Sequence, residues 1–194
     1  MDKLKLSGKH IILLFLYSPT EGNDINVPIP GRTRIVKMMF IFKQEVKQDF
    51  LNNNIKEIEL PDFIPYDYGP YAVDVYKDLE FLLNNGFIND IITNEELSEA
   101  ELEEYSEQIE EYALEGEGGY IESDRTQYNY TLTEKGRKFT EEKIWNKLTT
   151  EQKDLIIRFK TNINNSSLYS ILRYVYLQYP EMTRKSKIKE EVVG

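Results

Sequence analysis

The apolar positions of the chain recur mostly at steps of three and four residues, which is the period of a helix that buries one face. Residues 7–18 are apolar nearly all round and predict a helix that is packed on several sides. Residues 32–50 place apolar side chains at steps of 4, 3, 4 and 4, which predicts a long amphipathic helix. Further helices are predicted over about residues 71–85, 95–114, 134–148, 150–161 and 168–179. We therefore expect a mainly helical protein.

The stretch from Phe63 to Gly86 organises the predicted fold. Within it, Asp67-Tyr68-Gly69-Pro70 predicts a turn, because glycine tolerates positive φ and proline fixes its own φ. A helix follows and ends at Gly86, which suits a helix C-cap because it lacks a Cβ atom. Beyond this helix, the apolar pair Phe87-Ile88 and the segment Tyr128–Leu132 predict two strands.

This order of helix, strand, acidic excursion, strand and helix predicts the second half of a winged helix-turn-helix. The two strands form the wing, and the acidic excursion, about residues 93–124, is a helical insertion within it. Thr93-Asn94-Glu95-Glu96 has the spacing of a capping box for the inserted helix, and Thr133 is expected to cap the helix after the wing. Thr149-Thr150-Glu151-Gln152 carries another capping signature at the start of the next helix. We divide the chain into a winged-helix domain, residues 1–148, and a C-terminal helical extension packed on it, residues 149–194.

Composition narrows the classes of function. The 194 residues include no Cys, which excludes disulfides, thiolate catalysis and the common zinc ribbons. With no signal peptide and no run of about 18 apolar residues, we expect a soluble cytoplasmic protein without a membrane span. His10 is the one histidine, and its nearly all-apolar helix indicates a structural role. The chain also lacks a nucleophile elbow, a phosphate-binding loop and a calcium loop, so we expect no enzymatic activity, no metal and no cofactor.

The formal net charge of −10 is concentrated in one segment. Between Glu95 and Arg125 there are 12 Glu, 1 Asp and 1 Arg, so this segment carries −12 and the rest of the chain sums to +2. Acidic residues four apart destabilise a helix, so the predicted helix requires either cations or a packed apolar stripe. We expect its face to bind a basic partner protein, and the alternative is that it packs on its own domain. The residues expected to contact the partner are Glu99, Glu103, Glu107, Glu111, Tyr105 and Tyr112.

The alternative function is a winged-helix transcription regulator that binds DNA. Its expected phosphate contacts are Arg32, Arg34, Lys37, Lys135, Arg137 and Lys138, although an ordinary solvated face is the favoured interpretation of any single basic cluster. Against this, the helix that would enter the major groove begins with Tyr71, Asp74, Lys77 and Asp78, a poor set for approaching phosphates. A third hypothesis is a homodimer through the last helix, because that helix is unusually aromatic for a solvated surface. Its tyrosines are Tyr169, Tyr174, Tyr176 and Tyr179.

Four motifs resemble one protein family. They are Gly31-Arg32-Thr33-Arg34, Tyr68-Gly69-Pro70-Tyr71, Leu132-Thr133-Glu134-Lys135-Gly136 and Tyr179-Pro180-Glu181-Met182-Thr183. Together they resemble the YwgA-like proteins and the wider SocA-type antitoxin (Panacea) domains, over about residues 9–188. The resemblance implies a small bacterial or phage regulatory protein, related to antitoxins that neutralise or deliver a partner protein, and it supplies no catalytic residues. The long acidic insertion departs from the compact form of that family. Our leading prediction is a non-enzymatic regulator of antitoxin or adaptor type.

Overall fold

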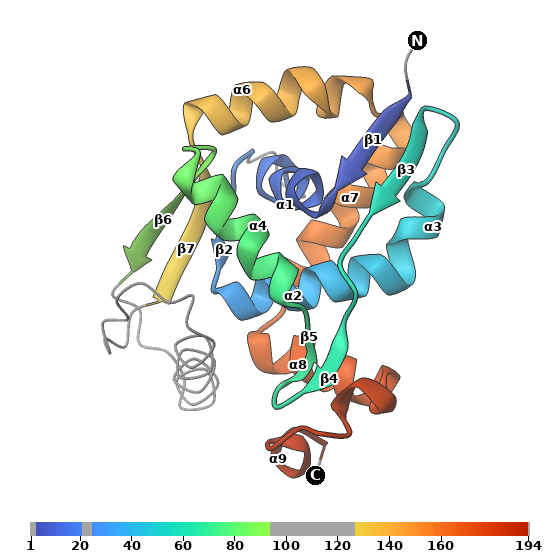
Figure 1. The fold of residues 1–194 in the computed structure, drawn as a ribbon, viewed down its shortest axis with the longest axis vertical. Helices are drawn as coiled ribbons and strands as arrows, with labels where there is room; N and C mark the ends of the chain where they lie inside the picture. Colours follow the sequence, from blue (N-terminus) through green and yellow to red (C-terminus); the bar gives the residue numbers. More distant parts are fainter. Residues whose placement is uncertain (1–2, 21–24, 94–126, 194) are drawn as a thin grey trace.

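The computed structural model describes residues 3–20, 25–93 and 127–193, and within these ranges the protein is mostly helical with three small sheets (Figure 1). The mainly helical class predicted from the apolar pattern is confirmed. The acidic insertion lies outside the described residues, and so do all six residues expected to contact a partner through it. None of the helices in the described ranges is long and apolar enough to cross a membrane.

Helix α1, Gly8–Tyr17, lies at the centre of the molecule (Figure 1). Ile11, Ile12, Leu14 and Phe15 are fully buried, because helices pack against α1 on several sides. These neighbours are α2 (Arg32–Ile41), α4 (Val73–Asn84), α6 (Glu134–Lys143) and α7 (Thr150–Asn164). The prediction of a helix surrounded by others is therefore confirmed.

The long helix predicted over residues 32–50 is one continuous rod in three parts. Helix α2 runs into a π-helical turn, η1 (Phe42–Val46), which leads directly into α3 (Lys47–Phe50). Phe42 and Phe50 are fully buried and pack edge to face, with ring centroids 5.6 Å apart. Glu45 lies in the π-helical turn and is exposed to solvent.

The two predicted strands pair as expected. Strand β6 (Ile88–Thr93) lies antiparallel to β7 (Gln127–Leu132), with Ile88 opposite Leu132 at one end of the register. A short third strand, β2 (Ile29–Pro30), pairs with the other edge of β7, so the strand order is β2-β7-β6. The sheet therefore has one strand more than the predicted two-stranded wing.

The other two sheets each contain two strands. Strand β1 (Leu4–Ser7), which the sequence did not predict, runs parallel to β3 (Ile55–Glu59). Strands β4 (Ile64–Tyr66) and β5 (Gly69–Tyr71) form a hairpin around the turn predicted at residues 67–70. Gly69 has a φ of +88°, which is unfavourable for other residues, so the glycine fixes the position of this turn.

Local capping signals correctly marked two helix starts. The Oγ1 atom of Thr133 accepts a hydrogen bond from the backbone N–H of Gly136 at 3.0 Å, and this bond caps α6. Thr149 and Gln152 form a reciprocal capping box at the start of α7. The helix predicted over residues 134–148 ends earlier, at Lys143, because the chain turns at Ile144 and buries that side chain. The 3-10 turn η2 (Trp145–Lys147) follows.

The C-terminal helices share the core of the preceding segments. The ring of Phe159 in α7 packs against Phe15 of α1 and Phe42 of η1, with centroid distances of 5.4 and 6.0 Å. Helix α8 (Leu168–Gln178) packs on α2, and the chain closes with η3 (Pro180–Thr183) and α9 (Lys189–Val193). The apolar core therefore continues from residues 1–148 into residues 149–194.

Candidate functional site

Two of the six predicted phosphate contacts are buried, and that part of the prediction is wrong. Arg34 is 7% exposed, and its Nη1 atom donates to the carbonyl oxygens of Ile163 and Ser166 at 2.8 and 2.7 Å. Lys37 is 2% exposed, and its Nζ atom donates to the carbonyl oxygen of Tyr68 at 2.6 Å. Both cations satisfy backbone carbonyls in the interior, so neither can reach a phosphate group in this fold.

The other predicted phosphate contacts lie nearer the surface but do not form one basic face. Arg32 donates from Nε to the hydroxyl of Tyr130 at 2.8 Å. On α6, Arg137 forms ion pairs with Glu134 at 2.8 Å and Glu141 at 3.5 Å. The remaining two cations, Lys135 and Lys138, are exposed on the same helix, and Lys135 donates to a backbone carbonyl at 2.6 Å.

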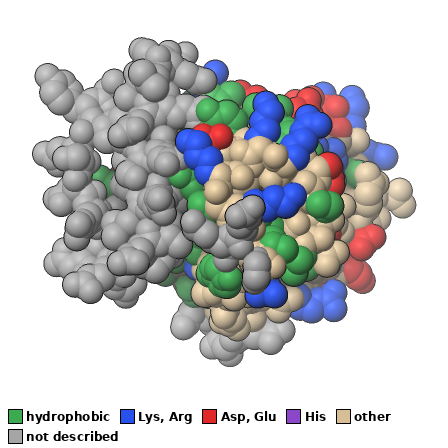
Figure 2. All heavy atoms as spheres, turned by 90° about the horizontal axis from the view of Figure 1, so that it is seen from below, with side chains coloured by type: hydrophobic (Ala, Val, Ile, Leu, Met, Phe, Trp, Pro, Cys, Tyr) green, Lys and Arg blue, Asp and Glu red, His purple; other side chains and the backbone are tan. Residues whose placement is uncertain are grey.

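Basic side chains are also present at the end of the molecule that carries α8, α9 and the β4–β5 hairpin. Figure 2 shows that, on the described part of this face, they are interspersed with uncharged and acidic groups. The exposed cations of the C-terminal segment include Arg184, Lys185, Lys187 and Lys189. Lys187 forms an ion pair with Asp67 at 2.7 Å. This mixed arrangement differs from the continuous basic stripe that is typical of a nucleic-acid interface.

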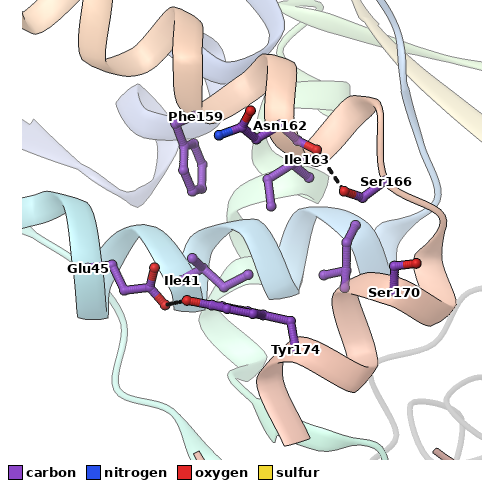
Figure 3. Close-up of a pocket in the computed structure, with 9 residues that line it drawn as sticks. Ile41, Glu45, Phe159, Asn162, Ile163, Ser166, Ser170 and Tyr174 are labelled. Atoms are coloured by element: carbon purple, nitrogen blue, oxygen red, sulfur yellow. Dashed lines mark hydrogen bonds between the residues drawn. The ribbon is translucent and has the colours of Figure 1, made fainter. Parts of the chain in front are cut away.

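A cavity lined by described residues lies between the α2–η1 rod, α7 and α8. It has a volume of about 410 Å³, and Figure 3 shows how its side chains converge from the three elements. Its apolar lining consists of Ile41, Phe159, Ile163 and Ile171, and its polar lining consists of Glu45, Asn162, Ser166, Ser170 and Tyr174. The apolar residues are buried and most of the polar ones are exposed, so the pocket has an apolar floor and a polar mouth.

Glu45 is the charged group at the mouth of the pocket. Its Oε1 atom accepts hydrogen bonds from the hydroxyls of Tyr174 and Tyr179, at 2.8 and 2.7 Å. Burial, and then the hydrogen bond to Glu45, raise the pKa of Tyr174 to about 12, and the same causes raise the pKa of Tyr179. Both tyrosines therefore remain protonated donors at neutral pH and orient the carboxylate. Among the described residues, Oε2 of Glu45 has no hydrogen-bond or ion-pair partner.

Sequence reasoning missed this pocket but singled out one of its lining residues, Tyr174, together with Tyr179, which contacts Glu45. The tyrosines of α8 were predicted to form a dimer surface, and Tyr169 and Tyr174 are indeed 46% and 42% exposed. Tyr176 is buried, with its hydroxyl 2.6 Å from the Oγ atom of Ser186, and Tyr179 contacts Glu45. The four tyrosines thus divide between the core, the pocket and the surface. The π-helical turn that holds Glu45 had no signal in the apolar spacing, although such turns are frequent at functional sites.

His10 has the structural role that the sequence indicated. The backbone N–H of Ser7 donates to its Nδ1 atom at 3.0 Å, which ties the first turn of α1 to its N-cap. Burial, and then the nearby positive charge of Lys9, lower the pKa of His10, so the ring is a neutral acceptor at pH 7. In the described ranges, no group of three or more histidine or acidic side chains is arranged to hold a metal ion.

The motifs that resemble the antitoxin family all lie at turns or helix starts. Gly31–Arg34 begins α2, and Tyr68–Tyr71 spans the β4–β5 hairpin. Leu132–Gly136 joins β7 to α6, and Tyr179–Thr183 leads into η3. Such positions constrain the backbone in many folds, so these motifs alone do not show a family. A scan against protein-family models and searches of curated proteins and of solved structures find no match to this chain.

Proposed function

We propose that this chain is a non-enzymatic regulatory protein of antitoxin or adaptor type that acts by binding a partner protein. In this proposal α1, α2, α4 and the β6–β7 pair form a winged-helix scaffold, and the acidic segment at residues 93–124 contacts a basic partner. The same scaffold supports DNA binding in other proteins, so the decisive question is which macromolecule the charges of this chain favour.

The observation that carries the proposal is the internal use of the basic side chains. A protein that binds duplex DNA neutralises several phosphates with exposed Lys and Arg residues. Here Arg34 and Lys37 are buried against backbone carbonyls, and Arg137 is paired with two carboxylates. The helix that would enter the major groove, α4, carries Asp74 in its first turn. These groups favour a protein partner over DNA.

The acidic segment supplies the attraction for that partner. Residues 95–125 carry a charge of −12, against +2 for the rest of the chain. A concentrated field of one sign accelerates association with a partner of opposite sign and disfavours phosphate. The resemblance to antitoxins that neutralise or deliver another protein points to the same class of function.

Two measurements on the full chain test the proposal. In the first, fluorescence anisotropy follows binding to random 24-base-pair duplex DNA at 50 and 200 mM salt, and we expect no salt-dependent binding. In the second, the tagged protein is isolated from its native cells without nuclease, at low and at raised salt, bound DNA and bound protein are both quantified, and we expect one protein to co-purify in stoichiometric amount. Stoichiometric DNA that dissociates steeply with salt would overturn the proposal in favour of a DNA-binding regulator.

A matched pair of variants identifies the surface involved. The first variant changes Glu99, Glu103, Glu107 and Glu111 to Gln, and we expect it to lose the co-purified protein. The control variant removes the same number of charges elsewhere, with Gln or Asn at exposed Glu59, Glu142, Asp154 and Glu181. We expect the control to retain the partner. Equal loss from both variants would indicate that only net charge matters and would refute a specific role for the acidic segment.

A further inference from the structure

We infer that the pocket between η1, α7 and α8 binds the side chain of an arginine, with the guanidinium group on Glu45. This inference rests on the proposed function, because it identifies how a basic partner protein is held by the described part of the chain. The pocket has an apolar floor, an oriented charge and a volume that suits one long side chain.

The apolar floor suits the aliphatic part of an arginine. Phe159 and Ile163 point from α7 toward the α2–η1 rod, where Ile41 faces them (Figure 3). Ile41 and Phe159 are 4% and 8% exposed, so the floor of the pocket belongs to the core. A methylene stem that enters the pocket exchanges water for these side chains, while a charged head can remain at the polar mouth.

Glu45 provides an oriented anion at that mouth. The hydroxyls of Tyr174 and Tyr179 both donate to Oε1 and orient the carboxylate, and Figure 3 shows the bond from Tyr174. The second oxygen, Oε2, has no partner among the described residues. An exposed carboxylate that is oriented by two hydroxyls and has an unused oxygen favours a cationic donor and repels a carboxylate or a phosphate.

The shape of the site favours arginine over lysine. The ring of Tyr174 lies beside the carboxylate and offers a flat face on which a planar guanidinium can stack. A lysine ammonium is a strongly hydrated point charge and gains less from such a surface. The volume of about 410 Å³ lies near the lower limit of ligand pockets, which is roughly 300 Å³. One side chain with its neighbouring backbone fills such a space.

The test uses short peptides and the full chain. The probe is acetyl-Gly-Arg-Gly-amide, and its comparison peptides replace arginine with citrulline, which is neutral and of the same shape, or with lysine. Binding is followed by NMR through the δ1 methyl groups of labelled isoleucines. We expect the arginine peptide to shift the methyl resonances of Ile41, Ile163 and Ile171, which line the pocket. The methyl resonances of Ile11 and Ile12 in α1 should stay unchanged. We expect the citrulline peptide to shift none of them and the lysine peptide to bind more weakly.

Two variants assign the binding to Glu45. Glu45→Gln keeps an oxygen for the two tyrosines and removes the charge. We expect this variant to bind the arginine peptide about tenfold or more weakly than the original protein. Asp49→Asn removes one charge from an exposed position on α3, and we expect its affinity to stay within about twofold of the original protein. Equal binding of arginine and citrulline peptides, equal affinity of the Glu45→Gln variant, or unshifted pocket methyl groups would each overturn the inference.

The outcome is separable from the test of the proposed function. If a partner protein co-purifies but the arginine peptide does not bind, the inference fails and the proposed function stands. If the peptide binds through Glu45 but the chain isolates with DNA, the pocket is an arginine site and the proposed function fails. Equal binding of the lysine and arginine peptides would overturn the choice of arginine.

Discussion

Lys160 is a positively charged side chain in the interior of the protein. It is fully buried, and its Nζ atom donates to the carbonyl oxygens of Ser18 and Leu16 at 2.7 and 3.3 Å. These carbonyls lie at the C-terminal end of α1, where the helix dipole favours a cation. Burial nevertheless lowers the pKa of Lys160 to about 7. We predict that Lys160 makes the protein more stable as the pH rises above 7.

The magnitude follows from the difference between the folded and unfolded states. In the unfolded chain Lys160 has its ordinary pKa of 10.5, so it binds a proton there at pH values where the folded protein has released it. The unfolded state therefore holds one more proton between about pH 7 and 10.5, and the free energy of unfolding rises by about 1.4 kcal/mol per pH unit. Over the whole window the increase is about 5 kcal/mol. Below pH 7 both states are protonated, and the cost of burying the charge is fully present.

Urea unfolding at pH 7, 8 and 9 measures this dependence for three proteins, which are the original protein, Lys160→Met and Lys160→Gln. The other titrating groups are common to the three proteins, so their contributions to the unfolding free energy cancel in the differences. We expect the original protein to gain about 1.4 kcal/mol per pH unit relative to both variants. The glutamine variant separates the charge from the hydrogen bond, because it keeps a donor for the carbonyls. Parallel stability curves for all three proteins would refute the reasoning, as would a titration of the Lys160 Cε resonance near pH 10.

Three further predictions concern local contacts, each measured by urea unfolding. Gly136→Ala should lower the unfolding free energy by about 2 kcal/mol, because a Cβ atom there would collide with the carbonyl oxygen of Phe87. Thr133→Ala should lower the unfolding free energy by about 1 kcal/mol, because it removes the N-cap of α6. Burial, and then Lys9, lower the pKa of His10, so stability should fall as the pH drops below about 6.5. His10→Gln keeps an acceptor for the N-cap and should lack this dependence, whereas an unchanged pH profile would show that His10 does not titrate on unfolding.

Features encoded by neighbouring residues could be predicted from the sequence. The apolar run of α1, the turn around Gly69 and the capping residues Thr133 and Thr149 were all correctly located. Each depends on φ preferences, side-chain periodicity or a hydrogen bond within a few residues. Such signals need no knowledge of which segments meet in the folded protein.

Long-range contacts could not be predicted in the same way. The parallel pairing of β1 with β3 joins segments about 50 residues apart, and nothing in the short run Leu4–Ser7 specifies that register. The pocket combines Glu45 with Tyr174, whose hydroxyl lies 129 residues away along the chain. Arg34 and Lys37 were assigned to a solvated helix face, because a helical pattern does not indicate which cations find carbonyl oxygens in the interior. Sequence periodicity treats every Lys and Arg as exposed, whereas a cationic head that donates to carbonyl oxygens can be buried.

The buried cations alter the balance of charge that a partner encounters. Outside the acidic segment the chain sums to +2. Arg34, Lys37 and Lys160 are buried, and so is one acid, Asp78, which forms an ion pair with Lys9 at 2.7 Å. When these four buried groups are left out, the formal charges of the other side chains outside the acidic segment sum to zero. The scaffold therefore offers no net attraction to phosphate. No net charge in that remainder offsets the −12 of the acidic segment. A basic protein surface is the partner that such a distribution favours.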